Sequence, residues 1–340
     1  MKLAIDHFKD FYMSTKRLEQ AAQATKTAFV FPGQGSQKAG MLAELAEQFS
    51  VVQDTFAEAS AALGFDLWHI AQSGEGLDQT ENTQPVLLTA SIALWRVWLE
   101  LGGIVPKYLA GHSLGEYSAL VAAEAMTLAD AVKLVHLRGK LMQSAVPQGE
   151  GAMAAILGLA DDKVVELCEK VSAAGQGSVE AANYNAQGQV VIAGSAALVQ
   201  QVMAEAKEQS GKAIALPVSV PSHCTLMKPA AEKFAEALEQ TAIELPCLPV
   251  IQNVNAEIAT DVEQLRQALT AQLYQSVQWT RTMQYLQDQG IQYMVECGPG
   301  TVLSNLAKRL PNIEKAFAID SKARMEDALN AVLVAEGKIA

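Results

Sequence analysis

The sequence lacks the features by which secreted, disulfide-rich and zinc-binding proteins are recognised. Its 340 residues include only four cysteines, and no two of them form a C-x-x-C pair. The chain is far larger than disulfide-stapled domains, and the missing C-x-x-C pair argues against a structural zinc site. We expect four free thiols in a reducing cytoplasm, at Cys168, Cys224, Cys247 and Cys297.

Basic residues are scarce, and long apolar runs are missing. The 25 lysines and arginines are outnumbered by 37 acidic residues, which gives a net charge of −12. A nucleic-acid partner is therefore excluded, because phosphate binding needs a basic surface. No run reaches the roughly 18 apolar residues of a membrane-spanning helix, and charges interrupt the N-terminal segment where a secretion signal would be apolar. These absences predict a cytoplasmic protein without membrane insertion.

Short apolar runs alternate with alanine-rich helical patterns along most of the chain. Residues 27–31 and 107–110 have the pattern of strands, and each is followed by a glycine-containing loop and a helix. This alternation predicts an open α/β sheet with its active site at the carboxyl ends of the strands. Between residues 152 and 218 the order becomes strand, helix, strand, strand, helix, strand, which is typical of a ferredoxin-like module.

The predicted fold class is therefore α/β, with a large α/β-hydrolase-like domain around a parallel sheet and an inserted small ferredoxin-like domain. We expect the large domain to comprise residues 26–148 and 220–340, and the inserted domain to comprise residues 149–219. Residues 1–25 are predicted to form an N-terminal extension, either helical or disordered. A chain of this length exceeds one minimal core, which agrees with such a division.

The segment Gly111–Gly115, G-H-S-L-G, fits the nucleophile pattern G-x-S-x-G. An apolar strand precedes it and a helical pattern follows it, which is the context in which a sharp turn exposes a serine hydroxyl. The helix N-terminus also directs amide donors at a developing oxyanion. A serine that merely caps the helix is the alternative. The strand-turn-helix context favours Ser113 as a nucleophile.

A serine nucleophile needs a neighbouring base, and His223 is the best candidate. It stands where an apolar strand meets a proline and a loop begins, in the segment SVPSHC. His112 adjoins Ser113 and is expected to face the substrate or support the site, whereas His7, His69 and His136 are expected to be bystanders. The acids between Ser113 and His223 do not stand at strand ends. We therefore predict a Ser113–His223 dyad whose imidazole is oriented by a group other than a carboxylate, such as a backbone carbonyl.

Seven motifs in order carry a resemblance that extends over residues 27–331. They are FVFPGQGSQ at 29–37, TQPVLL at 83–88, GHSLGEYSAL at 111–120, LRGKLMQ at 137–143, NYNAQGQVVIAG at 183–194, VPSHCTLMKPAA at 220–231 and QLYQSVQW at 272–279. In these segments the chain resembles the malonyl-CoA:acyl carrier protein transacylases of bacterial fatty acid synthesis.

The resemblance implies a ping-pong acyl transfer through a malonyl-Ser113 intermediate, with His223 as general base and acid. Malonyl-CoA and the holo acyl carrier protein would be the partners. The backbone N–H groups of Gln34 and Leu114 are implied as the oxyanion hole. The backbone carbonyl of Gln272 is implied as the group that orients the base.

The resemblance also assigns the substrate contacts. Arg138 matches the arginine that binds the malonate carboxylate, and a guanidinium pairs bidentately with such a group. Gln84, Asn185 and His112 are expected to line or brace the pocket. Lys308 and Arg309 are expected at the carrier docking surface. Ser276 and Gln187 stand where the family commonly has proline, and we expect this to alter loop stiffness without loss of chemistry.

Neither a metal nor a prosthetic group is expected, because no phosphate-binding loop and no His/Cys cluster is present. We expect a monomer. Three alternatives remain open at this point. They are a serine hydrolase or thioesterase of the same fold, a malonyltransferase of a polyketide pathway, and a noncatalytic interaction module.

Overall fold

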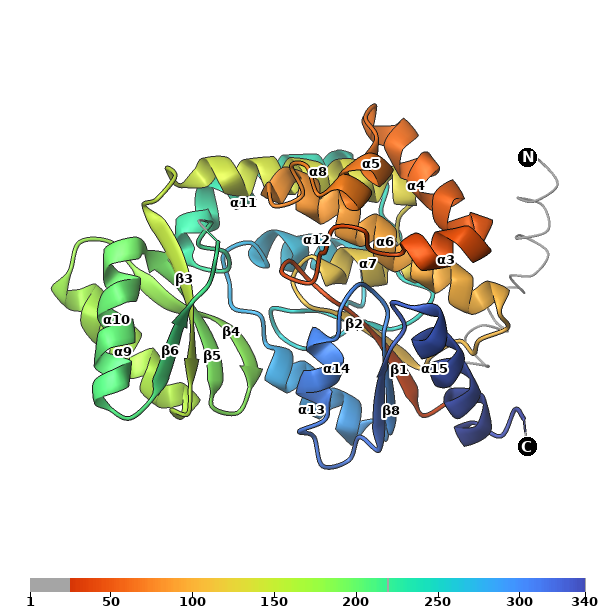
Figure 1. Cartoon of the computed structure of the whole chain (residues 1–340). Coiled ribbons are helices and arrows are strands. Elements are labelled where there is room, and N and C mark those ends of the chain that lie inside the picture. Colours follow the sequence, from red (N-terminus) through yellow and green to blue (C-terminus); the bar gives the residue numbers. More distant parts are fainter. Residues whose placement is uncertain (1–24, 219, 340) are drawn as a thin grey trace.

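The computed structural model describes residues 25–218 and 220–339, and it contains two β-sheets with helices packed against both (Figure 1). One sheet is parallel and the other antiparallel, so the mixed α/β class predicted from the sequence is confirmed. The predicted extension at residues 1–25 lies almost entirely outside the described residues. None of the helices in residues 25–218 and 220–339 is sufficiently long and apolar to cross a membrane.

The parallel sheet has five strands in the order β7-β2-β1-β8-β9. Their bounds are β1 Thr27–Phe31, β2 Tyr108–Gly111, β7 Val250–Ile251, β8 Tyr293–Glu296 and β9 Lys315–Ala318. All five residues of β1 are buried, because helices cover both faces of the sheet. Phe29 packs edge-on against Trp95 and Trp98 on one face, whereas Ala28 and Val30 belong to the apolar cluster on the other.

Eleven helices of the described residues belong to this larger part of the molecule. They are α3 Ala43–Gln48, α4 Ser50–Leu63, α5 Leu67–Ser73, α6 Thr80–Glu100, α7 Gly115–Ala122, α8 Leu128–Ala145, α11 Lys228–Gln240, α12 Val262–Ala271, α13 Trp279–Asp288, α14 Val302–Ala307 and α15 Lys322–Ala335, with a short 3-10 turn at Thr225–Met227. Helices α13 and α14 cover the face of Ala28 and Val30, and α6 and α7 cover the opposite face.

Helix α6 begins at Thr80 and contains Pro85 within its second turn. Proline cannot donate to the carbonyl four residues earlier, which here belongs to Glu81. Nδ1 of His136 on α8 takes the place of that donor and lies 2.8 Å from the carbonyl oxygen. The helix therefore continues through Pro85 without a lost hydrogen bond, and His136 is packed in the structure, as expected of a bystander in catalysis.

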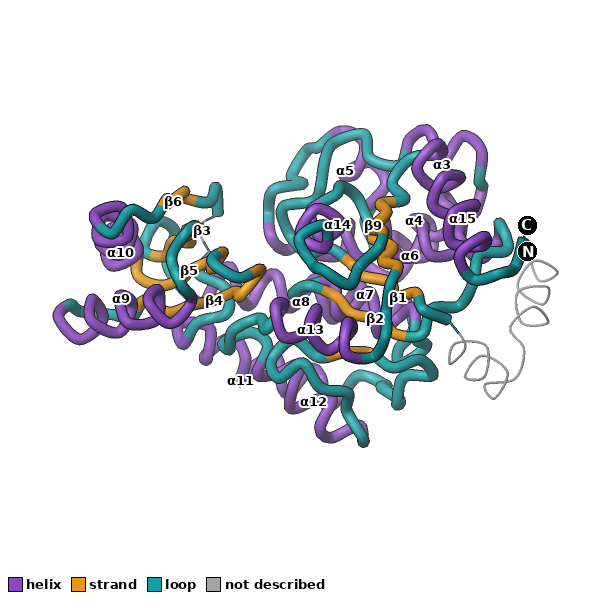
Figure 2. The backbone as a smooth tube through the Cα atoms, turned by 90° about the horizontal axis from the view of Figure 1, so that it is seen from below, coloured by secondary structure: helices purple, strands orange, loops and turns teal. Residues whose placement is uncertain are grey.

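The antiparallel sheet has four strands in the order β4-β5-β3-β6. In chain order, the elements of this part of the molecule are β3 Gly151–Leu157, α9 Asp161–Ala174, β4 Val179–Ala186, β5 Gln189–Ser195, α10 Ala196–Glu208 and β6 Lys212–Ala215. This is the strand-helix-strand-strand-helix-strand order predicted from the sequence. Figure 2 shows α9 and α10 on the side of this sheet that faces away from the rest of the molecule.

Strand β4 contacts the segment between α12 and α13 in the larger part of the molecule. Val277 pairs with Asn183 as a parallel bridge, and Oγ of Ser276 donates to the carbonyl of Ala181 at 2.6 Å. Serine at position 276 therefore supplies a cross-link that proline could not make. Met153 on β3 and Val191 on β5 belong to one apolar cluster and line a cavity that Ser113 also lines.

The two C-terminal elements, β9 and α15, differ in the signal that they leave in the sequence. In β9 only Phe317 is deeply buried, so a four-residue edge strand leaves little apolar pattern in the sequence. In α15 the buried residues are Met325, Ala328 and Val332, spaced by three and four positions. That spacing is the signal by which α15 could have been predicted.

Candidate active site

Ser113 stands at a sharp turn between β2 and α7. Its φ of +53° lies in the left-handed region, which a non-glycine residue occupies only where the surroundings hold it there. A Cβ atom at Gly111 would collide with the backbone of Gly115, and one at Gly115 would collide with the carbonyl of Phe31. Both glycines of the motif are therefore needed for the close approach of β1, β2 and α7. The strand, turn and helix lie where the motif predicts them.

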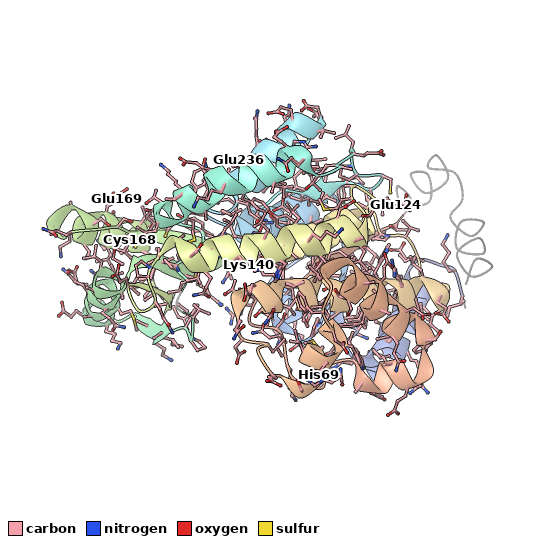
Figure 3. All side chains as sticks on the ribbon, turned by 90° about the horizontal axis from the view of Figure 1, so that it is seen from above. His69, Glu124, Lys140, Cys168, Glu169 and Glu236 are labelled. Carbon is pink, nitrogen blue, oxygen red and sulfur yellow. The ribbon has the colours of Figure 1, made fainter. Side chains whose placement is uncertain are left out.

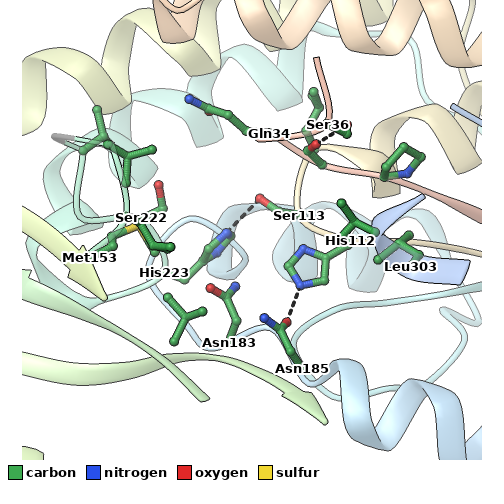
Figure 4. A pocket seen from close by; sticks show the side chains of 18 of the residues that line it. Gln34, Ser36, His112, Ser113, Met153, Asn183, Asn185, Ser222, His223 and Leu303 are labelled. Atoms are coloured by element: carbon green, nitrogen blue, oxygen red, sulfur yellow. Dashed lines mark hydrogen bonds between the residues drawn. The ribbon is translucent and has the colours of Figure 1, made fainter. Parts of the chain in front are cut away.

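Oγ of Ser113 lies 2.8 Å from Nε2 of His223 (Figure 4). Nδ1 of the same ring lies 2.7 Å from the backbone oxygen of Gln272. A carbonyl only accepts, so Nδ1 carries the proton and the lone pair of Nε2 faces the serine hydroxyl. The residues expected as nucleophile, base and base-orienting carbonyl are thus in contact, although His223 and Gln272 come from separate loops.

The imidazole of His223 is kept neutral by its surroundings. Burial and the positive charge of Arg138 lower its pKa to about 3. Its φ of +63° places the ring in the site from the loop that precedes the turn at Thr225–Met227. A neutral imidazole with a free lone pair can accept the proton of Ser113 at any pH near neutrality.

Arg138 on α8 is almost completely buried, and its guanidinium lies beside the serine. It donates to Oε1 of Gln84 at 2.9 Å, to Oε1 of Gln272 at 3.0 Å and to Oγ of Ser113 at 3.4 Å. Its Nε has no hydrogen-bond partner among the described residues. Burial lowers the pKa of Arg138. A buried cation with spare donors beside a nucleophile fits an anionic substrate group.

Asn253 and Glu116 support the turn that carries Ser113, and the sequence analysis identified neither of them. Oδ1 of Asn253 accepts from the backbone N–H of Ser113 at 2.7 Å, and its Nδ2 donates to the carbonyl of Gly111 at 2.6 Å. Oε2 of Glu116 accepts from Nε2 of Gln272 at 2.6 Å and from the backbone N–H of Asn253 at 3.2 Å. Asn253 follows β7 at the carboxyl edge of the sheet, a position that could have indicated it.

The cavity beside Ser113 has a volume of about 200 Å³. Gln34 and Leu114, expected as the oxyanion hole, both line it, as do His112 and Asn185. Nε2 of His112 lies 2.8 Å from Oδ1 of Asn185, so this pair joins the turn between β2 and α7 to strand β4 (Figure 4). Val302, Leu303 and Leu306 of α14 form another part of the wall.

Lys308 and Arg309 follow α14 directly. Nζ of Lys308 donates to Asn305 at 2.9 Å, and Arg309 donates to Oε1 of Gln189 on β5 at 3.0 Å. Both lie within three residues of Leu306, which lines the cavity. His69, expected to be a bystander, lies at the surface on α5 (Figure 3).

The arrangement has the parts of a covalent acyl transfer: a nucleophile, a neutral base, an oriented proton on the base and a buried cation. The described residues contain no group of three His, Cys, Asp or Glu side chains that could bind a metal ion. Nδ1 of His223 contacts the backbone oxygen of Gln272, and the carboxyl group of Glu116 contacts the side chain of Gln272.

Comparison with known proteins gives a consistent result. Residues 28–325 match the family described as the acyl transferase domain. The malonyl CoA-acyl carrier protein transacylases of Salmonella typhimurium and Escherichia coli K12 are each 52% identical over 308 residues, which is 90% of this chain and 99% of theirs.

Solved structures agree with these relatives. The crystal structure of FabD from Acinetobacter baumannii has a TM-score of 0.91 at 90% identity, covering 92% of this chain and 99% of that one. A malonyl-transacylase solved in complex with its type II polyketide acyl-carrier protein has a TM-score of 0.87 at 49% identity, covering 90% and 99%. The chain therefore belongs to the acyl transferase family, among the malonyl CoA-acyl carrier protein transacylases.

Proposed function

We propose that this protein transfers a malonyl group from malonyl-CoA to the phosphopantetheine thiol of an acyl carrier protein through a malonyl-Ser113 intermediate. The observation that carries the proposal is the buried guanidinium of Arg138 within 3.4 Å of a serine that contacts a neutral histidine. A nucleophile alone would suit many esters and thioesters. The cation beside it favours an acyl group that ends in a carboxylate.

In the first half of the reaction, Nε2 of His223 takes the proton of Ser113 as Oγ attacks the thioester carbonyl of malonyl-CoA. The backbone N–H groups of Gln34 and Leu114 stabilise the resulting oxyanion, a contribution of about 10²–10³ in rate for each donor. His223 then gives the proton to the departing CoA thiolate. The carbonyl of Gln272 stabilises the protonated ring through Nδ1, 2.7 Å away.

In the second half, the carrier thiol takes the place of CoA. His223 removes the thiol proton, the thiolate attacks the malonyl-serine carbonyl, and the same proton returns to Oγ of Ser113. Arg138 holds the malonyl carboxylate in both halves, so the acyl group keeps its orientation while the thiols exchange. A hydrogen bond of this kind to a charged group contributes about 1.5–3 kcal/mol.

The other predicted residues are proposed to support these steps. Gln84 orients Arg138 through its 2.9 Å hydrogen bond, and the His112–Asn185 pair braces the substrate side of the cavity. Lys308 and Arg309 are proposed to contact the carrier protein. We further propose a monomeric cytoplasmic enzyme without a prosthetic group, with residues 149–219 as a domain inserted between residues 26–148 and 220–340.

Intact-protein mass spectrometry after mixing with malonyl-CoA tests the proposal. The expected result is a malonyl adduct on Ser113 that disappears when phosphopantetheinylated carrier protein is added, with malonyl-carrier formed in equal amount. Ser113→Ala is expected to abolish the adduct, while Ser144→Ala, an exposed serine on α8, keeps it. The absence of a wild-type adduct would refute the covalent mechanism.

Two alternatives of the same fold give different products. A hydrolase or thioesterase would release malonate at a rate unaffected by the carrier protein. A polyketide malonyltransferase would prefer a polyketide carrier, and the related complex with a type II polyketide carrier makes this comparison worthwhile. Measuring kcat/KM with a fatty acid carrier and a polyketide carrier distinguishes the two pathways. A noncatalytic module would form no adduct at all.

A further inference from the structure

Glu116 is a buried carboxyl group with an unusual role in the packing of the site. Only 1% of the residue is exposed, and its Oε2 holds both Gln272 and Asn253. Each of those residues in turn holds a backbone group of Ser113. Nε2 of Gln272 donates to the serine carbonyl at 2.9 Å, and Asn253 accepts from the serine N–H at 2.7 Å.

Gln272 also connects Glu116 with Arg138. Its Nε2 points to Glu116 and its Oε1 accepts from Arg138 at 3.0 Å, so one amide bridges a buried anion and a buried cation. Two ionisable side chains act on Glu116: Arg138 on α8 and Tyr117 on its own helix α7. Its hydrogen-bond partners Gln272 and Asn253 are neutral. When Glu116 is ionised, its carboxylate is therefore the counter-charge of Arg138 in the free protein, through the amide of Gln272.

A substrate carboxylate at Arg138 changes this balance. One cation would then face two anions, while Arg138 and Glu116 are each only 1% exposed, and an unpaired buried charge is costly. The cation cannot gain charge, and the substrate carboxylate is held directly by the guanidinium. The group that can lose its charge at the smallest cost is Glu116, which contacts Arg138 only through an amide.

We propose that Glu116 takes up a proton from solvent when the substrate carboxylate binds at Arg138, so that the buried cluster exchanges one negative charge for another. The proton goes to Oε1, and no covalent bond other than this O–H forms or breaks. Glu116 is thus a positioning residue that holds the nucleophile in both charge states and is the proton acceptor that admits a dicarboxylic acyl group. This inference rests on the proposed function of Arg138.

The two oxygens of Glu116 differ in a way that fits the proposal. Oε2 makes both hydrogen bonds, whereas Oε1 is buried with no partner among the described residues. A proton on Oε1 leaves the bonds to Gln272 and Asn253 in place, so Ser113 keeps its position. Burial already raises the pKa of Glu116 to about 7, so a nearby second anion needs to raise it only a little further.

Isothermal titration calorimetry measures how many protons the protein takes up when a ligand binds. The variant Ser113→Ala is used because it lacks the nucleophile and cannot cleave the thioester. Malonyl-CoA and acetyl-CoA are titrated separately in buffers of different ionisation enthalpy, at about pH 8 and about pH 6. We expect malonyl-CoA to take up a measurable fraction of a proton more than acetyl-CoA at the higher pH, and almost none more at the lower pH. Protons taken up by the CoA moiety cancel because both ligands carry it.

The double variant Ser113→Ala/Glu116→Gln is expected to lose the extra proton, because glutamine keeps the hydrogen-bond acceptor and removes the titrating group. Ser113→Ala/Glu58→Gln is the matched control, since Glu58 pairs with Arg96 at the surface. Equal proton numbers for malonyl-CoA and acetyl-CoA would overturn the inference, as would an extra proton that survives Glu116→Gln. If the double variant does not fold, the comparison of the two ligands alone decides.

Failure of this inference is distinct from failure of the proposed function. A wild-type protein that forms malonyl-Ser113 while its Ser113→Ala variant takes up no extra proton retains the proposed function and refutes the role of Glu116. A wild-type protein that forms no malonyl adduct refutes the proposed function itself.

Discussion

Oε2 of Glu116 and Nε2 of Gln272 lie 2.6 Å apart, although 156 positions separate the two residues in the chain. The same glutamine accepts from His223 through its backbone oxygen and from Arg138 through its side chain. The base, the cation and the buried carboxylate are thus joined through one residue. Changes of charge in this cluster are therefore expected to affect both binding and stability.

Replacement of Arg138 by alanine is expected to lower kcat/KM for malonyl-CoA by roughly 10- to 150-fold, the equivalent of about 1.5–3 kcal/mol. Transfer from acetyl-CoA should change little, because acetate has no carboxylate for the guanidinium to bind. Arg96→Ala, which removes a surface arginine paired with Glu58, is the control. An unchanged malonyl preference in Arg138→Ala would remove Arg138 from the substrate site.

The stability of the protein at mildly acid pH is expected to depend on two opposing groups. Burial lowers the pKa of His223 from 6.5 to about 3, so the folded state binds fewer protons than the unfolded state and stability is lost as the pH falls. Burial raises the pKa of Glu116 from 4.5 to about 7, so that contribution is present at low pH and lost as the pH rises. Between pH 4.5 and 6.5 the two slopes oppose each other.

Urea unfolding of Glu116→Gln and His223→Gln across that range separates the two contributions. Relative to the wild type, Glu116→Gln should lose up to about 1.4 kcal/mol in the free energy of unfolding for each unit by which the pH falls. His223→Gln should show the opposite trend. Curves parallel to the wild type would mean that neither pKa is shifted in the folded state.

His136→Ala is expected to destabilise the protein by about 1–3 kcal/mol, because the carbonyl of Glu81 would lose the donor that replaces the missing N–H of Pro85. Pro85→Ala restores a backbone N–H at that position. The double variant Pro85→Ala/His136→Ala should therefore be more stable than the sum of the two single changes predicts. Additive changes in the free energy of unfolding would show that the hydrogen bond contributes nothing.

Charge reversal at Lys308 and Arg309 is expected to raise the KM for the carrier protein by about tenfold at low salt, with a smaller effect at high salt. The physical reason is that an acidic carrier meets a protein of net charge −12 and needs a local basic surface to approach the cavity. The KM for malonyl-CoA in the acylation half-reaction should not change. Lys322→Glu, on α15, is the control. If Lys322→Glu raises the KM for the carrier protein as much as the reversal at Lys308 and Arg309 does, the effect comes from net charge and not from a local docking surface.

Local patterns in the chain were enough to predict the strand-turn-helix around Ser113, the loop position of His223 and the order of elements in the antiparallel sheet. Each of these depends on neighbours within a few residues, such as the two glycines that allow β1, β2 and α7 to approach. The resemblance added Arg138 and Gln272, which carry no local signal. The roles of Asn253 and Glu116 escaped both approaches.

What the sequence by itself determined was the chemistry of the parts: a serine on a tight turn, a histidine in a loop, an arginine on a helix and an acid directly after the motif. Only the tertiary structure decided which atoms meet. Gln272, Asn253 and Glu116 come together because α12, β7 and α7 converge beneath the turn, and such long-range convergence leaves no periodicity in a single chain. The burial that shifts the pKa values of His223 and Glu116 is likewise a property of the packed protein, since it depends on water being excluded by residues distant in sequence.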